Sequence, residues 1–136
     1  MYFLTNKLKY KFVALALCSS FAVVSSCKDE EVSPFEDVTV QFVAIASPDV
    51  TMKAVVTQVG VEQSQNFDVE DKFVFMSVPR IVNSSVGALH LASTATSTDI
   101  DGELIVKILV NGQVKAADTI SGNGSLIAKT QFNFLD

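Results

Sequence analysis

The dipeptide Asn111-Gly112 constrains the fold of this chain most, because it lies between two runs in which apolar and polar residues alternate. Both central residues of a type I′ turn need positive φ, which Asn and Gly adopt at little cost, and this turn matches the twist of paired strands. The pattern therefore predicts a β-hairpin over residues 103–120. Its inner face is expected to hold Leu104, Val106, Ile108, Val110, Val114, Ala116 and Ile120.

Alternation with period two also predicts strands over residues 38–46, 51–59, 61–67, 72–78, 86–93 and 125–134. The inner face of the first would hold Val38, Val40, Phe42, Ala44 and Ala46, and that of the last Leu126, Ala128, Phe132 and Phe134. In strand 72–78, both sides are expected to be covered, because Phe73 and Phe75 alternate with Val74 and Met76. Residues 94–102 are predicted to form a polar loop.

Eight short strands separated by turn residues, with no helical stretch after residue 26, predict an all-β fold. The expected architecture is a small antiparallel β-sandwich of about seven or eight strands, immunoglobulin-like or transthyretin-like in type, or a small barrel.

The N-terminal residues have the three parts of a secretory signal. Lys7, Lys9 and Lys11 precede the apolar run 12–24, and small residues then lead to Cys27. The apolar run is shorter than the roughly 20 residues that a helix needs to cross the hydrocarbon of a membrane. We therefore expect it to be a poor anchor by itself.

The tetrapeptide Val24-Ser25-Ser26-Cys27 resembles a bacterial lipobox, which implies cleavage before Cys27 and attachment of lipid to that residue. The other interpretation is a buried core helix followed by a free thiol. Several acyl chains, at about 0.8 kcal/mol per buried methylene, would make a stable anchor where one chain is marginal. The expected organisation is a lipoprotein signal peptide over residues 1–26, a lipidated cysteine and acidic tether over 27–37, and a β-sandwich over 38–136.

The residues Lys28, Asp29, Glu30 and Glu31 follow the cysteine directly. They resemble the lipoprotein export signal of Bacteroidetes, which implies a protein that is lipid-anchored to the outer membrane and exposed at the cell surface. The alternative is a solvated tether on a protein that faces the periplasm.

Removal of the signal changes the composition of the chain. Residues 1–26 carry three of the ten basic residues and none of the fifteen acidic ones, so seven basic and fifteen acidic residues remain, a formal charge of −8. This charge argues against nucleic acid and anionic lipid as partners. Cys18 leaves with the signal and Cys27 carries the lipid, so the domain is expected to have no disulfide.

The residues that could perform chemistry are few, so we expect no enzyme and no cofactor. His90 is the sole histidine, in an alternating strand, and no nucleophile elbow, phosphate loop or paired Cys/His motif is present. Asp99, Asp101 and Glu103 are similar to the start of a calcium loop but lack its later ligands, so a turn is favoured and no metal site is predicted.

Two observations concern glycans. Asp118-Thr119-Ile120 matches the acceptor pattern of Bacteroidetes O-glycosylation, which makes Thr119 a candidate modification site. Sugar rings stack on Trp and Tyr. After residue 26 the chain has neither, so glycan binding ranks below contact with protein or lipid.

The order of parts over residues 88–134 is an Ala-rich strand, a polar loop with Gly102, the run LIVKILVNG, a returning strand, a Gly-rich loop and a final strand. It resembles the extracytoplasmic domain of the mycobacterial membrane protein small (MmpS) family. The chain departs from that family in having Val78-Pro79-Arg80 in place of a Pro-Trp step, and a lipobox in place of a transmembrane helix. The resemblance implies a β-sandwich outside the cytoplasm that assists an exporter of lipid or siderophore.

Together these features predict a non-enzymatic, surface-tethered lipoprotein that acts as an interaction or accessory module of a cell-envelope complex. Its expected partners are the membrane, through the N-terminal lipid, and an envelope protein. The alternative is a small-ligand carrier, for lipid or siderophore, associated with an envelope exporter.

Overall fold

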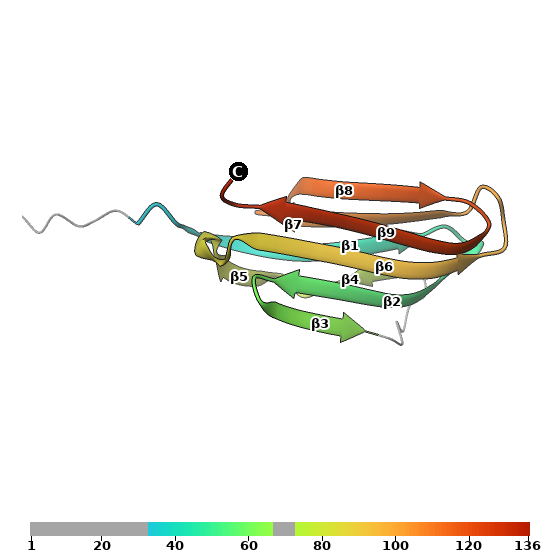
Figure 1. Cartoon of the computed structure of the whole chain (residues 1–136), viewed down its shortest axis with the longest axis horizontal. Coiled ribbons are helices and arrows are strands. Elements are labelled where there is room, and N and C mark those ends of the chain that lie inside the picture. Colours follow the sequence, from blue (N-terminus) through green and yellow to red (C-terminus); the bar gives the residue numbers. More distant parts are fainter. Residues whose placement is uncertain (1–32, 67–72) are drawn as a thin grey trace, which may run out of the picture. The chain divides into compact units, whose positions relative to one another are not determined.

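The computed structural model describes residues 33–66 and 73–136, which form a sandwich of two antiparallel sheets (Figure 1). The predicted all-β sandwich is confirmed. Sheet A contains β1 (Asp37–Ala46), β4 (Val74–Met76), β5 (Arg80–Asn83), β7 (Glu103–Val110) and β8 (Gln113–Ser121). Sheet B contains β2 (Val50–Val59), β3 (Glu62–Asn66), β6 (Ala88–Ser97) and β9 (Gly124–Asn133).

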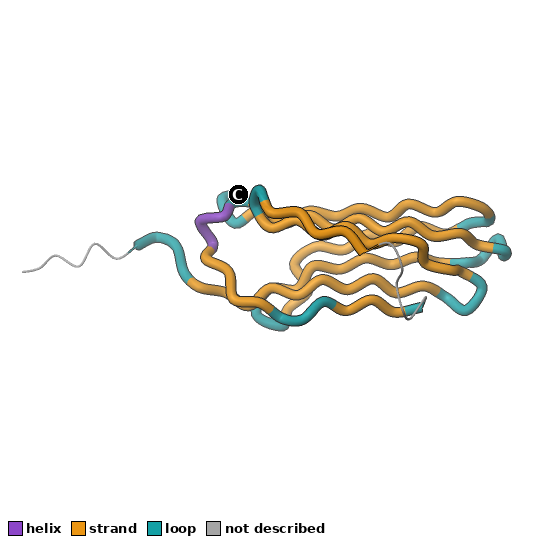
Figure 2. Tube along the Cα trace, turned by 90° about the horizontal axis from the view of Figure 1, so that it is seen from below, coloured by secondary structure: helices purple, strands orange, loops and turns teal. Residues whose placement is uncertain are grey.

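The strand order is β4-β1-β7-β8 in sheet A and β3-β2-β6-β9 in sheet B. One edge of sheet A is shared by two short strands, because β5 pairs with the first half of β1 and β4 with the second half. Figure 2, turned by 90° from Figure 1, shows the strands running along the length of the domain with most turns at its two ends, while the connection between β4 and β5 lies along one edge.

The core lies between the sheets and is built from alternate residues of each long strand. All five residues predicted for the inner face of β1 are at most 6% exposed, and so are the four predicted on β7. Sheet B contributes Met52, Val55, Leu89, Leu91 and Leu126. Each such side chain stabilises the fold by roughly 1.5–3 kcal/mol relative to exposure. Phe132 and Phe134 are partly buried against this core, as predicted.

The central hairpin has the predicted turn, with φ of 51° at Asn111 and 75° at Gly112. The prediction that Val114 lies on the inner face of this hairpin is wrong. Ile108 pairs with Ala116 but Leu109 pairs with Val114, so Lys115 is an extra residue in a β-bulge. The bulge turns Val114 to the outer face, where it is 52% exposed, while Ala116 and Ile120 pack against the core.

Three other predictions need correction. Both faces of strand 72–78 were expected to be covered, but Val74 and Met76 are 40% and 61% exposed, because β4 is a short edge strand and no described element packs on its outer side. Residues 94–97, predicted as loop, extend β6, since they pair with both β2 and β9. Strand β5 was not predicted, because it is only four residues long and follows Pro79.

The residues around a short 3₁₀ turn, Ser84–Val86, bring several segments together at one end of the domain. The backbone N–H of Ser84 donates to the carbonyl of Glu36 at 2.9 Å, and that of Phe134 donates to the carbonyl of Gly87 at 2.8 Å. The approach to β1 and the C-terminal residues therefore lie at the same end (Figure 2).

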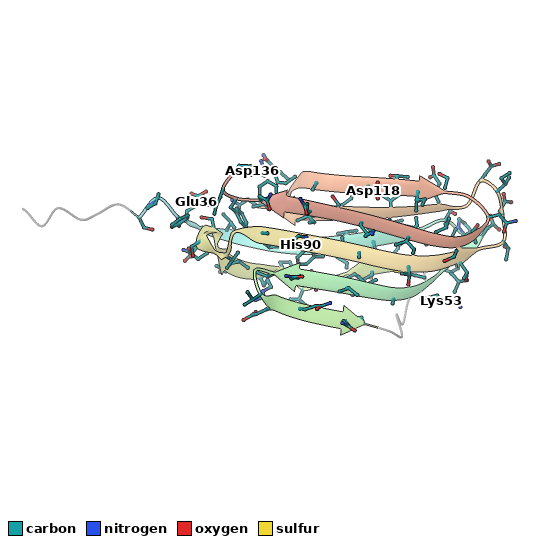
Figure 3. All side chains as sticks on the ribbon, viewed as in Figure 1. Glu36, Lys53, His90, Asp118 and Asp136 are labelled. Carbon is teal, nitrogen blue, oxygen red and sulfur yellow. The ribbon has the colours of Figure 1, made fainter. Side chains whose placement is uncertain are left out.

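Among the described residues, a polar contact joins the two sheets on each long side of the sandwich. On one side β8 and β9 lie next to each other, and the backbone N–H of Lys129 donates to Oδ2 of Asp118 at 3.1 Å (Figures 1 and 3). On the other side Arg80 of β5 forms an ion pair with Glu62 of β3 at 3.0 Å.

Candidate interaction surface

The proposed anchor cannot be located on the fold. Cys27 and the export residues Lys28, Asp29, Glu30 and Glu31 lie outside the described residues, so lipidation and export stay predictions. Within the described ranges, none of the helices has the length and apolar character needed to span a bilayer.

The acidic loop before β7 is a turn held by local hydrogen bonds. The backbone N–H of Asp101 donates to Oδ1 of Asp99 at 2.8 Å, and the Ser97 hydroxyl donates to the carbonyl of Asp99 at 2.7 Å. Across residues 33–66 and 73–136, no three His, Cys, Asp or Glu side chains are placed to hold a metal ion.

His90 lies near the start of β6 on the outer face of sheet B, half-buried (Figure 3). Its partners in register are Gln58 on β2 and Gln131 on β9. Neither amide titrates, so the arrangement places no acid or base directly beside the imidazole.

Thr119 is exposed on the outer face of β8, directly opposite Ile105. A hydroxyl in this position is sterically open to a glycan, so the modification predicted from Asp118-Thr119-Ile120 fits the fold without being tested by it.

The outer face of sheet A carries large apolar side chains on four strands, with Lys107 and Thr119 among them and with Val43 only 6% exposed. The register aligns Val74, Ile45 and Ile105 in one row, and the next row contains Met76 and Val43. Leu109 and Val114 face each other further along. The term apolar face is used below for these residues: Val43, Ile45, Val74, Met76, Ile105, Leu109 and Val114.

An antiparallel sheet with one face exposed to solvent normally has apolar residues on the inner face and polar residues on the outer face. The outer face of sheet A departs from this pattern. β7 carries the run LIVKILV, which is apolar on both faces except at Lys107. Such a run is typical of a strand covered on both sides. In the described part of the chain, sheet B covers the inner side of β7 and no element covers its outer side. The run LIVKILV was therefore a signal in the sequence for an apolar outer face of sheet A.

Lys107 is the charged residue within the apolar face, where it lies between Val43 and Ala117 in register and is half-buried. It forms no ion pair with any described residue. The edge next to β1 extends the apolar surface with Val78 and Ile81, which are 84% and 75% exposed.

Comparison with known proteins adds no family to these observations. No protein-family model matches the chain, and no curated protein has significant similarity to it.

Proposed function

We propose that this chain is a non-enzymatic, lipid-anchored lipoprotein that docks a protein of a cell-envelope complex through the apolar face of sheet A. The observation that carries the proposal is the exposure of Val74, Met76 and Val114 beside half-buried Ile45 and Ile105. Large apolar side chains gathered on one sheet face are typical of interaction sites, whereas single exposed ones need no explanation.

The charge at the centre of the face favours a particular kind of partner. A second copy stacked about a two-fold axis near the centre would place Lys107 against Lys107, and like charges across an interface are costly. A different protein with an apolar surface and one carboxylate opposite Lys107 would both bury the apolar face and pair with the lysine. Such a partner would also cover the outward-facing apolar side chains of β7, which come from the run LIVKILV.

The proposed anchor limits where this partner can lie. Asp37, where β1 starts, lies ten positions after Cys27, and an extended chain spans at most about 3.6 Å per residue. A lipid on Cys27 would keep the domain within roughly 35 Å of the membrane surface. The partner is therefore expected to be a membrane protein or another anchored protein.

The alternative function, a carrier for lipid or siderophore, needs space between the sheets. In the described domain that space holds a contiguous cluster of buried side chains, among them Met52, Leu89, Leu104 and Ile108. One hollow, of about 590 Å³, is lined mainly by residues of the outer face of sheet B. A smaller one, of about 380 Å³, lies at an edge of the sandwich between the β2–β3 hairpin of sheet B and β5 of sheet A, outside the filled core. Docking is therefore the better supported of the two proposals.

Site-specific photo-crosslinking in intact cells tests docking. A photoreactive residue at Met76 or Val114 is expected to cross-link to one envelope protein, whereas the same residue at Ile127, which is 50% exposed on the outer face of sheet B, is not. Lys107→Glu should abolish the cross-link, and an acid-to-lysine change in the partner should restore it. Equal cross-linking from all three positions, or none, would contradict the proposal.

A further inference from the structure

The outer face of sheet B has a chemistry opposite to that of sheet A. Gln63, Gln58, His90 and Gln131 are direct neighbours in register across β3, β2, β6 and β9. Four side chains that can each donate and accept hydrogen bonds thus form one row across all four strands, called the polar row below. Neighbouring strands are about 4.8 Å apart.

The next row creates a hollow beside the polar row. There Val56, Ala92 and Lys129 are neighbours in register. Because Ala92 is short and lies between longer side chains, the surface is concave. The hollow has a volume of about 590 Å³ and is lined by residues of both rows, including Gln58, His90 and Gln131.

The charge of this face differs from that of the chain. The whole sequence has fifteen acidic and ten basic residues. On β2, β6 and β9, the residues that alternate with the buried ones include no Asp or Glu, and Lys129 lies at the hollow itself. Within the described domain, the side chains that line the hollow include one cation, Lys129, and no carboxylate, while the carboxylate of Asp118 on β8 accepts a hydrogen bond from the backbone N–H of Lys129.

The polar groups at the hollow are available to a ligand. Among the described residues, His90, Gln131 and the Lys129 ammonium have no side-chain hydrogen bond or ion pair. Gln58 donates from Nε2 to the carbonyl of Gly60 at 2.7 Å, which leaves its Oε1 as an acceptor. The backbones of β2 and β6 are paired on both sides, so a ligand over these two strands is bound through side chains, whereas β9 is the edge strand of the sheet.

We infer that this hollow binds an acidic saccharide, meaning a sugar chain that carries carboxylates beside hydroxyl groups. Hydroxyls donate and accept, as do the amides of Gln58 and Gln131 and the imidazole of His90. The Lys129 ammonium pairs with a carboxylate, and Val56 and Ala92 lie against the C–H face of a ring. Recognition rests on hydrogen bonds instead of aromatic stacking, which explains how a domain without Trp or Tyr can bind a sugar.

An acidic peptide fits these features less well. Its backbone amides would need partners of their own, and over Gln58 and His90 the ladder hydrogen bonds of β2 and β6 are already used within the sheet, which leaves backbone partners only at the edge strand β9. The row of bifunctional side chains instead matches a ligand with a hydroxyl at nearly every carbon.

The test is an NMR titration of the full-length, isotopically labelled protein in detergent micelles with tetragalacturonate. We expect shifts of backbone amides on β2, β6 and β9 around His90. Lys129→Gln should weaken binding about tenfold or more, as expected for the loss of one charge-assisted hydrogen bond. Gln131→Ala should weaken it severalfold. Both side chains are exposed and form no hydrogen bond or ion pair with a described residue, so the fold should be retained, with spectra that stay dispersed.

The controls separate a specific site from a general effect of charge. Lys115→Gln removes the same charge from an exposed position of β8 and should leave the affinity unchanged. Uncharged maltotetraose should bind more weakly than tetragalacturonate. The inference is overturned if tetragalacturonate shifts no sheet B resonance, if both lysine variants lose affinity equally, or if a tetraglutamate peptide binds as tightly.

Discussion

Asn111 and Thr39 exchange two hydrogen bonds. The backbone N–H of Asn111 donates to the carbonyl of Thr39 at 2.8 Å, and the backbone N–H of Thr39 donates to Oδ1 of Asn111 at 2.9 Å. The residue that forms the β7–β8 turn therefore also fastens this turn to β1. One side chain links the local hairpin to the order of strands in sheet A.

Replacement of Asn111 should test this double role. Asn111→Ala places a residue with lower tolerance for positive φ at 51° and leaves the Thr39 N–H without its acceptor. We expect a loss of about 1–3 kcal/mol in the free energy of unfolding. Asn111→Gly keeps the turn conformation and loses only the acceptor, so it should cost less. Urea unfolding measures both, and equal losses would show that the side-chain hydrogen bond dominates.

Gly102 is required by packing. A Cβ at this position would overlap the hydroxyl of Ser97 and lie 2.8 Å from Cγ2 of Val50. Gly102→Ala should therefore destabilise the domain by about 1–3 kcal/mol, as overpacking does. In a Ser97→Gly background the cost should fall, because the main obstacle is gone. A double-mutant cycle from denaturant unfolding measures this coupling, and additive losses would refute the steric explanation.

The ion pair between Arg80 and Glu62 should add little to stability, although it joins the two sheets. Its side chains are 51% and 71% exposed, and exposed pairs contribute about 0–1 kcal/mol. Glu62→Gln is expected to change the free energy of unfolding by less than about 1 kcal/mol, and less still at high salt. A loss above 2 kcal/mol would mean that this contact holds the sheet edges together.

Protease shaving of intact cells should show which side of the membrane the domain faces. The wild-type protein is expected to be degraded, and a variant with Lys28, Asp29, Glu30 and Glu31 all changed to alanine to be protected. Cys27→Ala is the control for lipidation and should release soluble protein. Protection of both anchored forms would instead indicate the periplasmic face and favour a role beside an exporter.

Thr119 should carry the predicted glycan when the protein is made in a Bacteroidetes host. The intact mass of the wild type would then exceed the mass of its polypeptide and lipid. Thr119→Ala should remove the excess, while Thr119→Ser retains a hydroxyl and should keep it. A wild-type mass without any excess would show that the hydroxyl is merely exposed to solvent.

The local chemistry of the sequence determined the strands and the central turn. Alternation marks a buried face wherever a strand has one covered side, so the inner residues of β1, β7 and β9 could be predicted. Asn111-Gly112 fixed the hairpin, because few other pairs accept positive φ twice. These features depend on neighbours in the chain, and a single sequence contains them.

Only the tertiary structure decided which residues of the outer faces lie together. Lys115 becomes a bulge through its pairing partners, which turns Val114 outward against the expected alternation. The polar row joins Gln58, His90 and Gln131 from three strands, and no local pattern sets their register. Each strand's register depends on contacts between residues far apart in sequence, and both proposed binding surfaces arise from that register.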